Sequence, residues 1–235
     1  MTMIIKHIPN SITSLNLLSG CVSIVLALNG QPQAAALFIL LAALFDFLDG
    51  LAARVLHAYS PIGKELDSLA DVVSFGVAPA MILYHSLIGL AETTHSSPYW
   101  AWFAFLLPVA SALRLAKFNV DNRQDHFFLG LPTPANALFW AFGMAYSFDA
   151  DAFPFFYPLY LLPLILIFAG LMVSEVPMFS LKFKNLSWKE NKRTWLFLTG
   201  CLILMVLLGW EGISACIGLY IVLSLITGKA LKYTK

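Results

Sequence analysis

The chain has 235 residues, of which 60% are hydrophobic and 11% charged, and its formal net charge is +1. Together with a mean hydropathy of +0.80, this composition excludes an ordinary soluble domain. It is typical of a protein that crosses a membrane several times. The small net charge gives no indication of a nucleic-acid partner, and we expect none.

Eight apolar stretches are predicted to be transmembrane helices, because one span needs about 20 mostly apolar residues. They cover residues 11–29, 34–56, 66–90, 98–118, 132–149, 154–173, 195–209 and 211–228. The last two are short, and the boundary between them is left open. The expected fold is therefore all-α: a polytopic membrane helix bundle of about eight spans, forming one domain over residues 1–235.

The charged residues predict the orientation of this bundle. All fourteen Lys and Arg fall at the termini or on one side of the eight-span arrangement. The turns on the other side carry acids and no Lys or Arg; these acids are Glu92, Asp149, Asp151 and Glu211. By the positive-inside rule, we expect both termini in the cytoplasm of a cell (inner) membrane protein. We expect no cleaved signal peptide, because the first apolar run lacks a small-residue cleavage site.

Four aspartates interrupt the second and third apolar stretches, namely Asp46, Asp49, Asp67 and Asp71. An ionised Asp at the centre of a membrane helix costs about 2.5–3.5 kcal/mol, so these acids need compensation. Residues three and four apart share a helix face, which places the first two on one stripe and the last two on another. Because the turn between the helices is short, we expect antiparallel neighbours whose carboxylates converge.

The chemistry of this cluster favours divalent cations. Carboxylate oxygens without Cys or an inward His suit Mg²⁺ or Mn²⁺ rather than Zn²⁺. Four acids can hold two ions about 3.5–4 Å apart, an arrangement suited to displacement at phosphorus. A structural ion-pair network is disfavoured, because the acids outnumber the nearby cations Arg54 and Lys64.

The residues around the acids also suit a phosphate ligand. Gly50 and Ala53 leave room for a ligand or for close helix approach. Arg54 offers a planar fork of donors that matches phosphate oxygens. Ser60, in the turn, can donate to the same phosphates.

The complete pattern resembles the signature of a known family. It reads D-x-x-D-G-x-x-A-R from Asp46 to Arg54 and, after eight residues, G-x-x-x-D-x-x-x-D from Gly63 to Asp71. This is similar to the signature of the CDP-alcohol phosphotransferases. The flanks I-P-N-S-I-T, G-K-E-L-D-S-L-A-D-V-V-S-F-G, R-L-A-K-F-N and G-L-P-T-P-A-N resemble the bacterial and archaeal membrane-embedded phosphatidylserine synthases. The resemblance covers about residues 5–140, where we expect the catalytic core.

That resemblance implies a reaction and roles for individual residues. The reaction is attack of the L-serine hydroxyl on the β-phosphorus of CDP-diacylglycerol at the lipid bilayer, which releases CMP and forms phosphatidylserine. All four aspartates are implied ligands of two divalent ions, and Asp71 is also the implied general base. The implied contacts to CDP-diacylglycerol are Asn10, Thr13, Gly50, Arg54, Ser60 and Gly63. A homodimer is implied as well.

The acceptor site is predicted near Arg114, Lys117 and Asn119. Arg114 lies deeper in its apolar stretch and is favoured as a cation near the serine carboxylate or the phosphate, whereas snorkelling alone would explain Lys117. Asn10 and Thr13 also fit a simpler interpretation as polar residues at a helix entry.

Two alternative functions stay open. The first is the same chemistry with glycerol-3-phosphate or an inositol phosphate as acceptor; the scarcity of inward Lys and Arg favours a zwitterion such as serine instead. The second is a divalent-cation transporter. A conduction path should carry acids across the whole membrane depth, whereas these acids cluster at one end, beside Arg54.

Overall fold

The computed structural model describes residues 2–93, 95, 97–120, 129–146, 158–178 and 191–232. These parts of the chain are almost entirely helical, and one isolated antiparallel bridge joins Leu129 to Pro177. The α-helices are α1 (Thr2–Leu28), α2 (Pro32–Val55), α3 (Pro61–Asp71), α4 (Ala78–Thr93), α5 (Leu106–Val120), α6 (Thr133–Tyr146), α7 (Pro158–Val173), α8 (Lys192–Leu208) and α9 (Gly212–Lys232). The basic segment 182–189 and Arg123, used above for orientation, lie outside the described residues.

Five helical stretches are long and apolar enough to cross a membrane. They are His7–Leu28, Pro32–Val55, Pro61–Thr93, Pro98–Val120 and Thr194–Ile226. The last contains both α8 and α9, while α6 and α7 have only 14 and 16 residues. The predicted all-α, membrane-spanning class is confirmed, and the number of eight separate spans stays a prediction.

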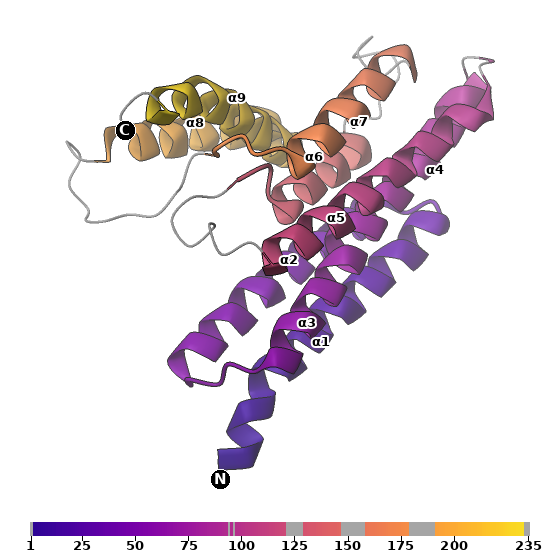
Figure 1. Cartoon of the computed structure of the whole chain (residues 1–235). Coiled ribbons are helices and arrows are strands. Elements are labelled where there is room, and N and C mark those ends of the chain that lie inside the picture. The colour runs from indigo at the N-terminus through magenta and orange to yellow at the C-terminus, as the bar shows by residue number, and fades with distance from the viewer. Residues whose placement is uncertain are drawn as a thin grey trace.

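Helix α1 lies at the centre of the N-terminal part. It packs against both α2 and α3, and these two helices make far more contacts with α1 than with each other. Figure 1 shows α1 to α5 running alongside one another, with the α8–α9 hairpin set to one side. That hairpin reaches the rest of the molecule through the packing of α9 on α6. The fully buried large side chains include Ile39, Leu83 and Trp140, which lie on α2, α4 and α6.

Local signals explain the short turn between α2 and α3. His57 adopts a left-handed backbone conformation (φ 49°) just after α2 ends. Ser60 then caps α3, because its Oγ accepts a hydrogen bond of 2.9 Å from the Gly63 backbone N–H. Pro61 occupies the first turn, where its missing N–H costs nothing. The start of α3 is thereby fixed close to the end of α2.

A π-helical turn, η1 (Val72–Val77), joins α3 to α4. On one side, Gly20 of α1 packs so closely that an added Cβ would lie 2.8 Å from Ser74 Cα. On the other side, a Cβ at Gly76 would lie 3.2 Å from Pro108 Cα of α5. Single π-turns inside helices are rare and frequently adjoin functional sites. This one begins directly after Asp71 and is held between α1 and α5.

Candidate functional site

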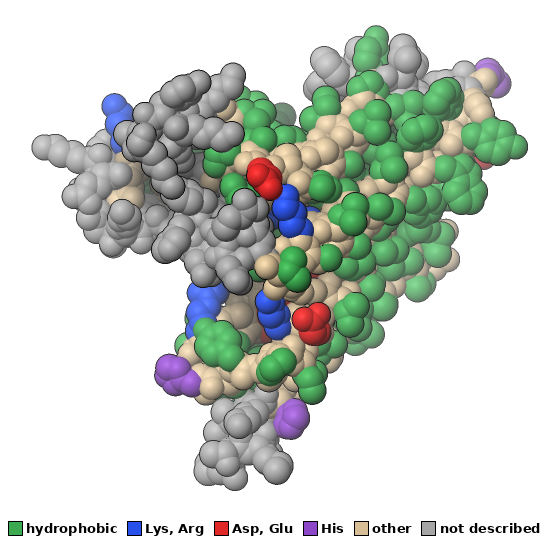
Figure 2. Space-filling view, viewed as in Figure 1, with side chains coloured by type: hydrophobic (Ala, Val, Ile, Leu, Met, Phe, Trp, Pro, Cys, Tyr) green, Lys and Arg blue, Asp and Glu red, His purple; other side chains and the backbone are tan. Residues whose placement is uncertain are grey.

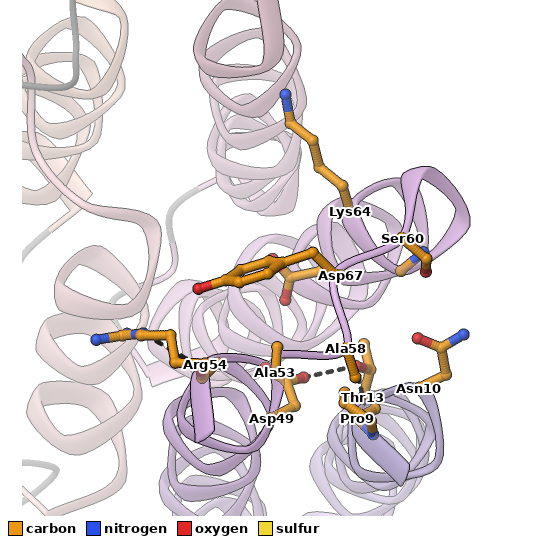
Figure 3. Close-up of a pocket in the computed structure, with 13 residues that line it drawn as sticks. Pro9, Asn10, Thr13, Asp49, Ala53, Arg54, Ala58, Ser60, Lys64 and Asp67 are labelled. Carbon is orange, nitrogen blue, oxygen red and sulfur yellow. Dashed lines mark hydrogen bonds between the residues drawn. The ribbon is translucent and has the colours of Figure 1, made fainter. Parts of the chain in front are cut away.

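A cavity of about 240 Å³ opens at the end of the bundle where α2 ends and α3 begins (Figure 3). Figure 2 shows a hollow between Lys and Arg side chains at this end of the molecule. The cavity is lined by Pro9, Asn10, Thr13, Asp49, Gly50, Ala53, Arg54, Ala58, Tyr59, Ser60, Gly63, Lys64 and Asp67. All six residues predicted to contact CDP-diacylglycerol are in this lining, beside two of the four aspartates.

Three aspartates converge next to the cavity. Asp46, Asp49 and Asp67 each offer a carboxylate oxygen, and these oxygens lie within 4.8 Å of one another. The Oδ1 atom of Asp67 is buried and has no hydrogen-bond partner among the described residues. Ionised carboxylates this close repel one another, and a bound cation offsets that repulsion. The set of hard oxygen donors therefore fits Mg²⁺ or Mn²⁺.

Asp71 lies outside this 4.8 Å group but interacts electrostatically with all three of its members. Its side chain is only 7% exposed, and Oδ1 accepts a hydrogen bond of 3.2 Å from Asn16 Nδ2. It lies one turn beyond Asp67 on α3, directly before the π-turn. The structure thus brings three of the predicted metal ligands into one group and places the fourth deeper in the bundle.

Nearby protein cations do not neutralise the acids. Arg54 is exposed, its Nε donates to Gly50 O at 3.1 Å, and Figure 3 shows its guanidinium extending away from Asp49. Lys64 Nζ donates to Asn119 O at 3.0 Å. Where the structure describes side chains, the salt bridge found joins Lys117 to Glu175, and none reaches an aspartate of the cluster. This shortage of partners strengthens the fit to divalent ions.

Helix α1 contributes contacts that the sequence analysis missed. The Thr13 hydroxyl donates to Asp49 Oδ2 at 2.6 Å; Pro9 O, at 3.0 Å, is a longer alternative acceptor. The Asn16 amide donates to Asp71. A signal for Asn16 was present, since Asn10, Thr13 and Asn16 recur every third residue and so share one face of an otherwise apolar helix.

Arg114, predicted for the acceptor site, makes structural contacts. It is 8% exposed, and its Nη1 donates to Leu129 O at 2.8 Å and to Met172 O at 3.3 Å. Gly130, the residue after Leu129, has φ 73°. An added Cβ there would lie 2.7 Å from Met172 O and 2.9 Å from Arg114 Nη1, so a side chain at this position would collide with the contact. Arg114 therefore ties α5 to α7 through backbone carbonyls.

The other two predicted acceptor residues also face protein partners. Lys117 Nζ lies 3.1 Å from Glu175 Oε1. Asn119 Nδ2 donates to Ser68 Oγ at 2.9 Å. Neither of them, nor Arg114, is in the lining of the 240 Å³ cavity. Their acceptor roles stay predictions.

Comparison with known proteins adds an independent finding. Residues 6–175 match a family model described as CDP-alcohol phosphatidyltransferase. The "CDP-diacylglycerol--serine O-phosphatidyltransferase" of Mycobacterium leprae (strain TN) is 44% identical over 142 residues, which is 57% of this chain and 45% of that protein. A protein of the same name from Bacillus subtilis (strain 168) is 38% identical over 130 residues, 55% of this chain and 70% of the relative.

An archaeal relative has a different name. The "Archaetidylserine synthase" of Methanothermobacter thermautotrophicus is 38% identical over 136 residues, covering 56% of this chain and 54% of the relative. The chain spans about half the length of the mycobacterial and archaeal relatives that it matches.

Proposed function

The chain belongs to the CDP-alcohol phosphatidyltransferase family, and from this premise we propose that it transfers the phosphatidyl group of CDP-diacylglycerol to the hydroxyl of L-serine, giving phosphatidylserine and CMP. The names of the similar proteins support the choice of serine. The observation that carries the proposal is the convergence of three carboxylates beside a cavity lined by the predicted nucleotide contacts.

Two divalent ions, Mg²⁺ or Mn²⁺, belong to this proposal, with Asp46, Asp49, Asp67 and Asp71 as their ligands. When bound, such ions neutralise diphosphate charge and stabilise the leaving CMP. Asp71 is the proposed general base, which accepts the proton of the serine hydroxyl during the attack on phosphorus. Its place outside the carboxylate triad supports a role different from that of the other three acids.

The cytidine diphosphate part of the donor lipid would occupy the 240 Å³ cavity. The proposed contacts are Asn10, Thr13, Gly50, Arg54, Ser60 and Gly63. The absence of a side chain at Gly63 supports this, because an added Cβ would lie 2.9 Å from Asn10 Oδ1 and 3.0 Å from Ser60 Oγ. Arg54 is free to turn toward a diphosphate, since its own contact is to a carbonyl one turn earlier.

The serine site is proposed near the end of α5, with Arg114, Lys117 and Asn119. One contact supports this location: Lys64, which lines the cavity, donates to the backbone oxygen of Asn119. The end of α5 therefore adjoins the rim of the nucleotide cavity. An acceptor held there would approach the donor from the side of α3.

The proposal extends to topology and assembly. We place both termini and the active site on the cytoplasmic side of the cell (inner) membrane, with about eight spans and a homodimeric assembly. Arg54 and Lys64 line the cavity at the same end of the bundle, in agreement with the positive-inside rule.

The test is a panel of labelled alcohols offered to the purified protein with CDP-diacylglycerol, with the lipid product identified by mass spectrometry. We expect phosphatidylserine as the fastest product, and no product with the variant Asp46→Asn. Faster product with glycerol-3-phosphate or an inositol phosphate would overturn the serine assignment and leave the family membership intact.

A further inference from the structure

Helix α1 donates a side-chain hydrogen bond to one aspartate on each of the two acidic helices. Thr13 donates to Asp49 on α2, and Asn16, three residues later, donates to Asp71 on α3. Since α2 and α3 pack mainly on α1 rather than on each other, α1 is the element that sets the spacing between their carboxylates. Figure 3 shows the Thr13–Asp49 pair at the floor of the cavity.

Asn16 is buried, and its backbone is hydrogen-bonded to the turn that follows Asp71. Its side chain is fully buried, at 0% exposure. Its backbone oxygen accepts a hydrogen bond of 2.9 Å from Ser74 Oγ, which ties α1 to the π-turn that follows Asp71. One amide atom of Asn16 therefore faces Asp71 while the backbone at the same residue anchors the next turn of that helix.

The other amide atom of Asn16 lacks a partner. Oδ1 is buried and accepts no hydrogen bond from the described residues. Oδ1 is bonded to the same carbon as Nδ2, the atom that donates to Asp71. A buried acceptor without a donor is unfavourable, and a donor bound at the site would remove that cost. Mg²⁺ usually keeps several of its waters when carboxylates bind it, and such waters are donors.

We propose that Thr13 and Asn16 are positioning residues of the metal centre. Thr13 orients the Asp49 carboxylate, Asn16 orients the Asp71 carboxylate, and Asn16 Oδ1 accepts a hydrogen bond from a water of the bound ion. The inference rests on the divalent ions of the proposed function. It does not depend on which alcohol is the acceptor. Hydrogen-bond partners of metal ligands commonly change metal affinity about 10–100-fold when they are removed.

The same helix offers matched controls. The hydroxyls of Ser11 and Ser14 donate to backbone oxygens four residues earlier, as Thr13 can, but both side chains are exposed and reach no aspartate. Ser11→Ala and Ser14→Ala therefore remove a hydroxyl from α1 without touching the acidic cluster. Thr13→Val keeps the shape of the side chain and removes its hydroxyl, and Thr13→Ser restores the hydroxyl.

The experiment measures Mn²⁺ binding to the purified full chain, without substrate, from the electron paramagnetic resonance signal of free Mn²⁺. We expect Thr13→Val and Asn16→Leu to bind Mn²⁺ about 10–100-fold more weakly. Thr13→Ser and both serine variants should bind as the unsubstituted chain does. In metal-free detergent, Thr13→Val should still unfold in one cooperative transition, with a melting temperature lowered by no more than one lost hydrogen bond allows, which separates positioning from loss of fold. Thr13→Val decides the question if Asn16→Leu does not fold.

Unchanged Mn²⁺ affinity in Thr13→Val would overturn the inference. The outcome is separable from that of the proposed function. If the variants lose Mn²⁺ affinity but the unsubstituted chain does not use serine, the inference stands and the serine assignment falls. If phosphatidylserine forms and the variants bind Mn²⁺ normally, only the inference falls.

Discussion

Helices α1 and α2 and the hairpin of α8 and α9 are all apolar enough to cross a membrane, yet they bury different side chains. In apolar 18-residue windows of His7–Leu28 and Pro32–Val55, 33% and 28% of the residues are buried, against 11% in Thr194–Ile226. Helix α1 buries Thr13, Asn16, Ser19 and Ser23, while α8 exposes large apolar side chains such as Val206. The family match, residues 6–175, ends before α8 begins.

This difference separates two uses of a hydrophobic helix. An exposed apolar side chain on such a helix is suited to contact with lipid. A buried polar side chain needs a partner, and it is retained where chemistry or specific packing requires it. The acidic helices and α1 belong to the second kind. Substitutions should therefore have large effects around the aspartates and small effects on the hairpin.

The largest effects are expected at the aspartates, and beside Asp46→Asn the most informative change is Asp71→Asn. The substitution keeps the shape of the side chain and removes the proposed proton acceptor. Loss of a general base typically lowers turnover about 10²–10⁴-fold. CMP release at saturating CDP-diacylglycerol and serine measures it, and binding of CDP-diacylglycerol should be partly retained because three other acids remain. Near-normal turnover would show that Asp71 is not the base.

Arg114→Ala should be the next most damaging change. The backbone oxygens of Leu129, which is partly buried, and of Met172, which is buried, would lose their donor. An unsatisfied buried group costs about 1–3 kcal/mol, which should appear as a lower melting temperature in detergent.

The same variant tests the acceptor role of Arg114. Contact with serine predicts that the serine KM rises more than the CDP-diacylglycerol KM. Equal changes in the two constants, together with a lower melting temperature, would make Arg114 a purely structural residue. Arg114→Lys is the control, because it keeps the charge and one donor.

Arg54→Lys should have a moderate effect. Lysine keeps the charge but cannot reproduce a two-pronged contact to phosphate. Because Arg54 is exposed and its present contact is only to Gly50 O, we expect roughly tenfold weaker binding of CDP-diacylglycerol, within the range for one charge-assisted hydrogen bond. Binding of a fluorescent CDP-diacylglycerol analogue in nanodiscs measures it. Unchanged affinity would reduce Arg54 to a topological anchor.

The smallest effect should come from the hairpin. Val206 is 78% exposed on α8, so Val206→Ala removes apolar surface that faces lipid and creates no cavity. Stability and activity should stay within about 0.5 kcal/mol of the unsubstituted chain, as is usual for surface substitutions. A large loss of activity would mean that the hairpin contributes to the site, and the contrast between the two regions would fail.

The helices themselves could be predicted closely from the sequence, because hydrophobic length is a local property. The predicted stretch 34–56 corresponds to α2 at Pro32–Val55. Each of the other predicted stretches also contains a helix, although α1 begins at Thr2 rather than at residue 11. The helix-like spacing of the aspartates likewise anticipated that acids from α2 and α3 would meet.

Features that depend on packing between distant segments were not predictable. The short turn between α2 and α3 indicated that they are neighbours, but it gave no sign that α1 lies against both of them. The π-turn after Asp71 is held where Gly20 approaches Ser74 and Gly76 approaches Pro108, which only the folded chain reveals. The contacts of Arg114 were not predictable either, because its carbonyl partners follow it by 15 and 58 residues.

The central claim is that the acidic cluster works with divalent ions to transfer a phosphatidyl group. Its most direct test is serine-dependent CMP release from CDP-diacylglycerol by the reconstituted protein, first in excess EDTA and then with Mg²⁺ or Mn²⁺ added back. The account predicts no release in EDTA, recovery with either ion, and no recovery in Asp46→Asn. Full turnover in EDTA, or recovery in that variant equal to the unsubstituted chain, would contradict it.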